Sequence, residues 1–176
     1  MDKTDFRRKA KEIRKNLGIK KISEAISANI AGLKEFQNAK HIMLYYPIKN
    51  ELNLLNLMTT DQYFYLPRMK NKELEVCPYN QGDNLKITNY NIPEPITTPV
   101  DKNIVDLVLV PALMADSLFN RLGYGGGYYD RFFANTNYYK IVGIPDELLA
   151  DQLPTEETDI KCDCIVTQSK ILKQHN

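Results

Sequence analysis

The sequence has little of what an exported or membrane protein needs. It contains three cysteines in 176 residues, and a small odd number argues against a disulfide framework and for a reducing compartment. No apolar run comes near the ~20 residues that a membrane-spanning helix requires. Residues 1–5 carry charges and lack the apolar core of a signal peptide. We therefore expect a cytoplasmic protein that does not bind a membrane.

Histidine is also scarce. His41 and His175 are the only two histidines in the sequence, and no credible Ser–His–Asp triad can be built from them. Cys162 and Cys164 lie one residue apart, but two further ligands for a zinc site are missing. We expect both thiols to pack in the core as small apolar groups.

The remaining composition is typical of one globular domain. The chain is 43% hydrophobic and 26% charged, and it is long enough to bury a core, so residues 1–176 are expected to form a single domain. The net charge is +1, but residues 1–21 carry nine basic and three acidic side chains. This basic end indicates either an anionic partner or the solvated face of a helix.

The hydrophobic periodicity predicts alternating helices and strands. Apolar residues spaced three and four apart predict helices over 6–17 and 22–33, and shorter ones over 52–58 and 128–133. Compact apolar runs predict strands over 41–46, 63–66, 74–77, 105–110, 140–144 and 162–166, whereas 79–102 is expected to be mostly irregular. This order favours an α/β fold, a three-layer α/β/α domain with a mostly parallel sheet.

The most informative segment is a glycine cluster over residues 121–130. Four of the eight glycines fall within residues 123–127, between a predicted strand and a predicted helix. Glycine lets backbone N–H groups approach a ligand closely, so the segment predicts a site for an anion, most simply a phosphate. It matches neither the Walker A loop nor the dinucleotide-binding pattern. The alternative is a tight strand-to-helix connection without a ligand.

Residues 110–131 closely resemble the signature of the 5-formyltetrahydrofolate cyclo-ligases, also called 5,10-methenyltetrahydrofolate synthetases. The match includes Arg121-Leu122-Gly123-x-Gly125-x-Gly127-Tyr128-Tyr129-Asp130. Weaker matches follow in family order: the Lys-x-x-x-Arg of residues 3–7, and residues 46–51, 66–68, 91–95 and 153–163. Ala112, Ala115 and Asn120 depart from the pattern; Ala115 removes an aromatic that could wall the cavity, while Asn120 tolerates the left-handed turn geometry of the usual glycine.

The resemblance implies an ATP-dependent ligase of folate one-carbon metabolism. ATP would phosphorylate the formyl oxygen of 5-formyltetrahydrofolate. Attack by the neighbouring nitrogen would then release phosphate and give 5,10-methenyltetrahydrofolate and ADP. Phosphoryl transfer depends mainly on positioning and electrostatic stabilisation, so few protein acids or bases are required. ATP as co-substrate and Mg²⁺ as cofactor are implied.

The same resemblance assigns the residues of the site. Lys3, Arg7 and Arg121 are implied as the catalytic cations. The ATP-binding residues would be Lys3, Thr4, Asp5, Phe6, Arg7, Arg121, Leu122, Gly123, Tyr124, Gly125, Gly126, Gly127, Tyr128 and Tyr129. The folate would contact Tyr46, Glu51, Tyr124, Gly125, Gly126, Gly127 and Tyr128. Asp130 and Asp159 would hold Mg²⁺.

Other interpretations remain open. The basic N-terminal helix could instead belong to a non-catalytic protein that binds RNA or the ribosome, although this leaves the glycine segment unexplained. An enzyme that uses ATP on another small molecule is a second alternative. Glu51 could merely be a charge at a helix N-terminus, and Asp130 a surface residue. With the cyclo-ligase interpretation we expect a monomer that binds small molecules and no nucleic acid.

Overall fold

The computed structural model describes residues 1–175, which form four α-helices, three short 3-10 helices and twelve strands. The helices are α1 (Lys3–Lys15), α2 (Ile19–Ala31), α3 (Lys34–Asn38) and α4 (Tyr128–Phe133), with the 3-10 helices η1 (Leu55–Leu57), η2 (Lys102–Ile104) and η3 (Asp146–Leu148). The strands are β1 (His41–Met43), β2 (Tyr63–Lys70), β3 (Glu73–Pro78), β4 (Leu85–Ile87), β5 (Pro93–Pro95), β6 (Leu107–Leu109), β7 (Met114–Asp116), β8 (Arg121–Leu122), β9 (Tyr139–Gly143), β10 (Leu149–Ala150), β11 (Cys164–Val166) and β12 (Ile171–Lys173).

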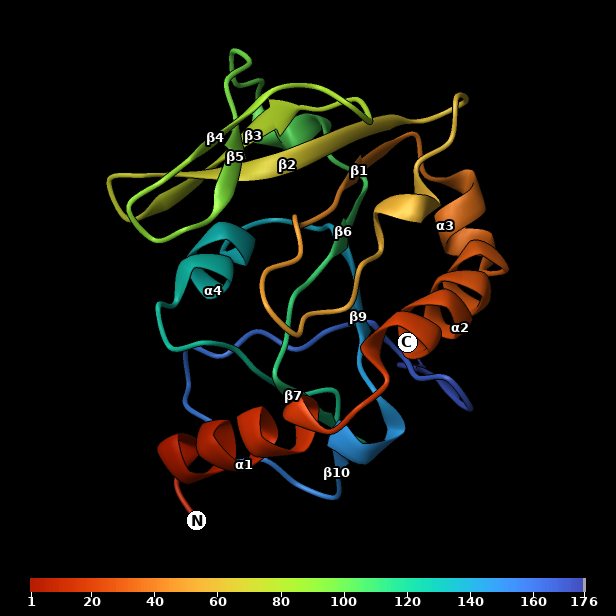
Figure 1. Cartoon of the computed structure of the whole chain (residues 1–176), viewed down its shortest axis with the longest axis vertical. Helices are drawn as coiled ribbons and strands as arrows, with labels where there is room; N and C mark the ends of the chain where they lie inside the picture. Colours follow the sequence, from red (N-terminus) through yellow and green to blue (C-terminus); the bar gives the residue numbers. More distant parts are fainter. Residues whose placement is uncertain (176) are drawn as a thin grey trace.

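The centre of the fold is a seven-stranded sheet in the order β12-β11-β9-β6-β1-β2-β3. The five strands from β11 to β2 run parallel, and β12 and β3 pair antiparallel at the two edges. Helices α2 and α3 cover one side of the sheet and α4 lies on the other (Figure 1). The predicted three-layer α/β fold with a mostly parallel sheet is confirmed.

The parallel strands are apolar throughout because both of their faces are buried. In β6, Leu107 and Leu109 pack with α2 and α3, whereas Val108 faces the opposite cluster, which contains Phe132 and Phe133 of α4. The strands β1, β9 and β11 divide their residues between the two clusters in the same way. A continuous apolar run is the sequence pattern that two covered faces require.

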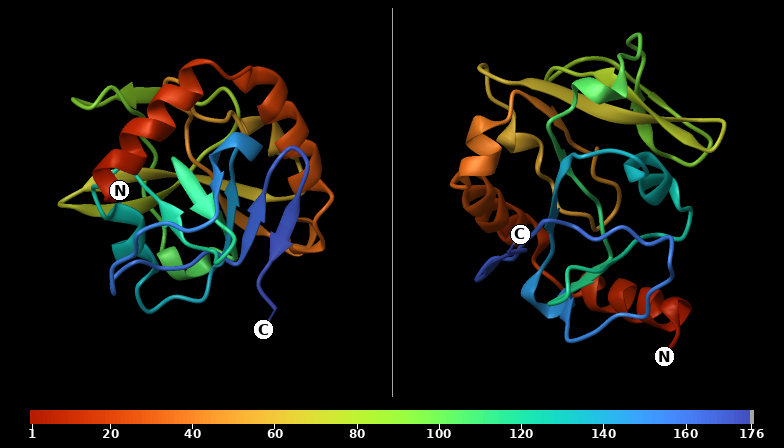
Figure 2. Two further views of the ribbon diagram at one scale, coloured as in Figure 1. Left: turned by 90° about the horizontal axis from the view of Figure 1, so that it is seen from below. Right: turned by 180° about the vertical axis from the view of Figure 1, so that it is seen from behind.

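Helix α1 does not cover the large sheet. It packs beside a second sheet of three strands, in the order β10-β7-β8, at one end of the molecule (Figures 1 and 2). The predicted stripe of Phe6, Ala10, Ile13 and Leu17 makes this contact, against a cluster that includes Leu113 and Leu148. The opposite face of α1 is exposed, and its basic side chains, Arg8, Lys9, Lys11 and Lys15, lie in water.

Several local expectations were wrong. Residues 52–58 form no α-helix but the single 3-10 turn η1, because Leu52, Leu54 and Leu57 are all buried without helical spacing. Strand β2 continues through Pro67, where only β3 is its neighbour, so the missing N–H breaks no second ladder. Residues 79–102 are mostly irregular, as expected, and also contain the short β4–β5 hairpin. Of the described residues, none belongs to a helix long and apolar enough to cross a membrane.

One buried carboxylate holds the turn that precedes the glycine segment. Asp116 is fully buried, and its Oδ1 accepts hydrogen bonds from the backbone N–H groups of Leu118 (3.0 Å) and Asn120 (2.9 Å). Its Oδ2 accepts from Asn120 Nδ2 (3.0 Å) and from the N–H of Leu153 (2.8 Å). The left-handed residue of this turn is Phe119 (φ +67°) and not Asn120, whose side chain acts instead as a partner of Asp116.

Replacing this carboxylate is expected to destabilise the protein strongly. Asp116→Ala leaves one buried N–H group, that of Leu153, and the part-buried donors of Leu118 and Asn120 without their acceptor, so the free energy of unfolding should fall by about 3 kcal/mol. Urea denaturation measures the change, and Asp151→Ala, at an exposed acidic position of the neighbouring loop, is the matched control. Equal stability losses in the two variants would contradict the role given to Asp116.

Candidate active site

A cavity of about 1340 Å³ lies beside the carboxyl ends of two neighbouring parallel strands. Tyr45 and Tyr46 follow β1, Pro111 follows β6, and all three line it. The rest of the wall comes from the start of α1, from β2, β3 and the β4–β5 hairpin, and from residues 121–131 and 154–160. Ligand sites of parallel α/β sheets occur at this edge. The volume exceeds the roughly 300–1000 Å³ of a cavity for one small ligand.

One end of the cavity is cationic. Lys3 Nζ lies 2.7 Å from Asp159 Oδ2 and 3.4 Å from Glu156. The guanidinium of Arg121 is almost fully buried; its Nη2 lies 2.8 Å from Asp130 Oδ1, while its Nε has no hydrogen-bond partner among the described residues. The Nη1 group of Arg121 also donates no hydrogen bond within residues 1–175, and the side chain lines the cavity, so Nη1 has donor capacity left for a ligand.

The glycine segment forms the floor between the cations. The backbone N–H groups of Tyr124, Gly125 and Gly126 donate no hydrogen bond to any residue within 1–175. Gly125 has a φ of +104°, and a Cβ built on it would lie 3.4 Å from Cζ of Arg7. Arg7 also donates from Nε to the carbonyl of Gly123 (3.0 Å). Consecutive free N–H groups beside a guanidinium form a cradle for an anion.

The far side of the segment is braced by Arg131. Its Nη2 donates to the carbonyls of Gly126 (3.0 Å) and Lys72 (2.8 Å), which ties the segment to the β2–β3 turn. Helix α4 spans only six residues, so we attribute the positive potential here mainly to the three cations rather than to a helix dipole.

Asp130 and Asp159, the carboxylates assigned to Mg²⁺, line the cationic end, together with Asp2 and Glu156. Asp130 also accepts a hydrogen bond from the N–H of Ile160 through Oδ1 (3.1 Å), and its Oδ2 has no hydrogen-bond partner within residues 1–175. No group of three or more His, Cys, Asp or Glu side chains in that range could hold a metal by itself. Mg²⁺ commonly takes one or two carboxylates and completes its shell with phosphate and water, so the pair fits a cation that arrives with a phosphate ligand.

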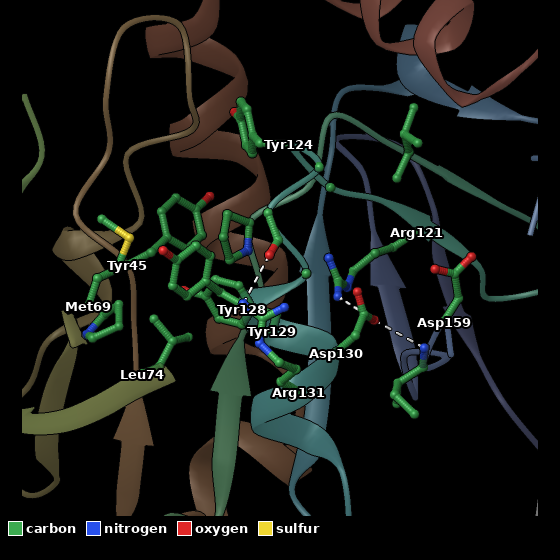
Figure 3. A pocket seen from close by; sticks show the side chains of 18 of the residues that line it. Tyr45, Met69, Leu74, Arg121, Tyr124, Tyr128, Tyr129, Asp130, Arg131 and Asp159 are labelled. Carbon is green, nitrogen blue, oxygen red and sulfur yellow. Dashed lines mark hydrogen bonds and ion pairs between the residues drawn. The ribbon is translucent and has the colours of Figure 1, made fainter. Parts of the chain in front are cut away.

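The other end of the cavity is aromatic and apolar. Figure 3 shows Tyr45, Met69 and Leu74 on one side, Arg121, Asp130 and Asp159 on the other, and Tyr128 and Tyr129 between them. The two ends thus differ in chemistry within one continuous cavity. Flat, partly apolar ligands suit the aromatic end, since tyrosine rings stack on them and keep a polar hydroxyl available.

Of the two carboxylates that line the aromatic end, Glu94 and Glu51, the one assigned to the folate is Glu51. Its Oε2 accepts a hydrogen bond from the N–H of Ile48 (2.9 Å). Burial raises the pKa of the Glu51 carboxyl, while hydrogen bonding to Tyr124 and Ile48 and the charge of Arg14 act in the opposite direction. Burial, followed by the charge of Glu51, raises the pKa of Tyr129 well above its ordinary value. The phenol therefore stays protonated beside a carboxylate that can accept N–H donors.

The structure gathers most of the residues that the sequence assigned. Of the assigned residues, those that line this cavity are Lys3, Thr4, Arg7, Tyr46, Glu51, Arg121, Leu122, Gly123, Tyr124, Gly125, Gly126, Gly127, Tyr128, Tyr129, Asp130 and Asp159. Asp5 and Phe6 do not line it. Asp5 completes the capping box of α1 with Asp2, and Phe6 packs against the core below the helix.

Some of the wall was missed from the sequence. Met69, Leu74 and the hairpin residues 90–94 come from β2 to β5, and only the Leu66–Pro67 and 91–95 matches gave a signal there. Neither Ala112 nor Ala115 lines the described cavity. Cys162 and Cys164 are buried as expected, and burial raises the pKa of each thiol to about 12.

Comparison with known proteins identifies one family. The model of the 5-formyltetrahydrofolate cyclo-ligase family matches residues 2–168. A 5-formyltetrahydrofolate cyclo-ligase of Escherichia coli K12 is 33% identical over 99 residues, 53% of this chain and 54% of the relative, so the chain spans about half the length of that protein. The cyclo-ligase of Haemophilus influenzae is 26% identical over 150 residues, covering 78% of this chain and 80% of the relative.

Solved structures agree with this result. A 5,10-methenyltetrahydrofolate synthetase of Aquifex aeolicus superposes with a TM-score of 0.88 at 29% identity, over 98% of this chain and 93% of the other. A synthetase of Mycoplasma pneumoniae superposes with a TM-score of 0.78 at 23% identity, over 96% of this chain and 99% of the other, and shows the fold alone.

A pair of glycine substitutions tests the anion cradle. Gly125→Ala and Gly82→Ala both place a side chain at a positive φ, but nothing lies within 4 Å of a Cβ at Gly82. Both variants should lose similar stability, of the order of 1 kcal/mol. Only Gly125→Ala should lose affinity for inorganic tripolyphosphate, measured by calorimetry, because its Cβ would lie against the Arg7 guanidinium in the space expected for the anion. Unchanged affinity in Gly125→Ala would exclude the segment as the anion site.

Proposed function

Because the chain belongs to the 5-formyltetrahydrofolate cyclo-ligase family, we propose that it converts 5-formyltetrahydrofolate and ATP to 5,10-methenyltetrahydrofolate, ADP and phosphate. One observation carries this proposal: a single cavity joins a cationic end to an aromatic end that contains a carboxylate, with the glycine segment between them. A reaction that transfers a phosphoryl group to a flat heterocyclic substrate needs both environments within reach of each other.

The cationic end would bind the phosphates of ATP. Lys3 and Arg7 are four residues apart on α1, so both can reach one ligand, and Arg121 faces them from β8. The N–H groups of residues 124–126 would donate to phosphate oxygens. Lys3 would exchange its ion pair with Asp159 for a phosphate, because both partners line the cavity and remain accessible to a ligand.

The aromatic end would bind the pterin of the folate. Glu51 would accept paired N–H bonds from the amino edge of the ring, and Tyr46 and Tyr128 would pack against its faces. Tyr124 stands at the junction of the two ends and would contact both substrates. Protein groups would thus hold the formyl oxygen of the folate in line with the terminal phosphate of ATP.

The chemistry balances with few protein proton transfers. The formyl oxygen attacks the γ-phosphorus, the bond to the β–γ bridging oxygen breaks, and ADP leaves. N10 then attacks the activated formyl carbon and loses its proton, and the C–O bond breaks to release phosphate. Arg121, Lys3 and Arg7 would stabilise the charge that develops on the transferred group, which is the main catalytic demand of phosphoryl transfer.

Asp130 and Asp159 would hold Mg²⁺ together with the ATP phosphates. When bound, the ion would neutralise phosphate charge. Before ATP binds, the same two carboxylates orient Lys3 and Arg121 through their ion pairs.

The RNA-binding alternative is not favoured by the placement of the basic residues. Lys3, Arg7 and Arg14 turn toward the protein, where they bond to Asp159, to Gly123 and to carbonyls of the interior. The outward residues of α1 remain, but part of their charge is locally paired: Arg8 with Asp5, and Lys15 with Glu12. We propose that the protein acts as a monomer in the cytoplasm, on small molecules rather than on nucleic acid.

A direct assay tests the proposal. Purified protein is mixed with 5-formyltetrahydrofolate and Mg-ATP, and the absorbance of the methenyl product is followed. Product formation that requires both substrates is the expected result. ATP consumption without dependence on the folate would favour an enzyme that acts on another small molecule, and salt-sensitive RNA binding without ATP binding would favour the non-catalytic alternative.

Four substitutions on α1 separate specific from diffuse charge effects. Lys3→Ala and Arg7→Ala should each weaken ATP binding by ~1–3 kcal/mol, because each loses a charged hydrogen bond. Lys11→Ala and Lys15→Ala, on the exposed face, should change it little. ATP affinity measured at two ionic strengths gives the comparison. Equal losses in all four variants that disappear in high salt would mean a diffuse anion attractor.

A further substitution separates the two substrates. Glu51→Gln should raise the KM for 5-formyltetrahydrofolate by about tenfold or more while changing the KM for ATP little, because a carboxylate that accepts charged or paired N–H bonds is lost. Since burial raises the pKa of Glu51, the wild-type KM for the folate should rise as the pH falls and the carboxylate protonates. Steady-state kinetics between pH 5 and 8 measure both effects. Equal effects on both KM values would assign Glu51 a structural role.

A further inference from the structure

Arg14 is a buried cation that the mechanism above does not use. It lies on the inner face of α1 and is 5% exposed. Within residues 1–175 it forms no ion pair with a carboxylate, and its Nε has no hydrogen-bond partner. A buried guanidinium without a counter-ion is costly, so its position needs a reason.

The hydrogen bonds of Arg14 reach two loops that border the cavity. Nη1 donates to the carbonyl of Asn50 (3.1 Å), the residue immediately before Glu51. Nη2 donates to the carbonyls of Ala112 and Leu113 (3.4 Å to the latter), which follow the cavity residue Pro111. Arg14 itself does not line the cavity. It therefore acts on the site only through these loops and through its charge.

The charge matters because of what surrounds Glu51. The groups that act on it from neighbouring elements are the hydroxyls of Tyr45 after β1, of Tyr124 in the glycine segment and of Tyr129 in α4, all neutral near pH 7. Arg14 of α1 is the one cation among the groups that lower the pKa of Glu51, within the described part of the chain. Without Arg14, less would offset the effect of burial, and the pKa of Glu51 would rise further.

We propose that Arg14 is a positioning residue of the folate end, which holds the Glu51 loop in place through the carbonyl of Asn50 and places a positive charge beside that loop. The inference rests on the proposed function, because it takes the pterin as the group that Glu51 binds. It extends that function by linking α1, which carries the ATP ligands Lys3 and Arg7, to the loop that carries the folate ligand.

Two variants at Arg14 and one control separate its tasks. Arg14→Met removes both the charge and the hydrogen bonds, Arg14→Lys keeps the charge but loses the fork that spans two loops, and Lys11→Met removes an exposed charge from the same helix. For each folded variant, KM values for both substrates and the pH dependence of kcat/KM for the folate are measured. A double variant, Arg14→Met with Glu51→Gln, tests whether Arg14 acts through Glu51.

Arg14→Met should raise the KM for the folate by about tenfold and the KM for ATP by no more than about twofold. In Arg14→Met, the acidic limb of the pH profile of kcat/KM for the folate should move to higher pH by about half a unit or more. Arg14→Lys should keep the wild-type position of this limb, and Lys11→Met should keep all wild-type values. The double variant should be no worse than Glu51→Gln alone. Parallel rises of both KM values, an unmoved limb, or additive losses in the double variant would overturn the inference.

If Arg14→Met does not fold, the KM of Arg14→Lys for the folate still tests the positioning role, and it should be higher than that of the wild type. A folate KM equal to that of the wild type would then remove the positioning role. A wild-type protein without turnover would instead overturn the proposed function. In that case equilibrium binding of 5-formyltetrahydrofolate decides about Arg14: weaker binding by Arg14→Lys, with Lys11→Met unchanged, supports the inference, and equal binding overturns it.

Discussion

The inner face of helix α1 is the constraint on which the site depends. Lys3, Arg7 and Arg14 stand four and seven residues apart, so they share one face of the helix. Each bonds to a different segment: Lys3 to Asp159, Arg7 to the carbonyl of Gly123, and Arg14 to loops that follow β1 and β6. The apolar stripe beside them fixes the helix on the small sheet. Docking one helix thereby sets the relative positions of three walls of the cavity.

The large sheet provides the rigid part of the same arrangement. Its inner strands are buried on both faces, and the loops after β1 and β6 carry Tyr45, Tyr46, Glu51 and Pro111 to one edge. The cationic residues come from other elements, and the glycine segment connects the two ends. The fold therefore places a cationic end and an aromatic end in one cavity, whose volume exceeds that of a typical site for one small ligand.

Short-range patterns in the sequence predicted the features that are determined by residues close together in the chain. The stripe of α1, the apolar parallel strands and the glycine segment all follow from spacing or from backbone freedom. The burial of Arg14 could not be predicted, because its acceptors Asn50 and Ala112 are carbonyls 36 and 98 residues away. The small sheet also escaped prediction, since β7, β8 and β10 have two or three residues each and no readable period. Asp5 and Phe6 were assigned with the surrounding motif, although the cap and the core use their side chains.

In the proposed reaction, the two ends of the cavity bring the formyl oxygen to the terminal phosphate of ATP. The most direct measurement follows that oxygen. The protein is given 5-formyltetrahydrofolate labelled with ¹⁸O in the formyl group and Mg-ATP, and the released phosphate is examined by mass spectrometry. Each molecule of methenyl product should be accompanied by one phosphate that carries the label. Label found in water, with unlabelled phosphate, would contradict it.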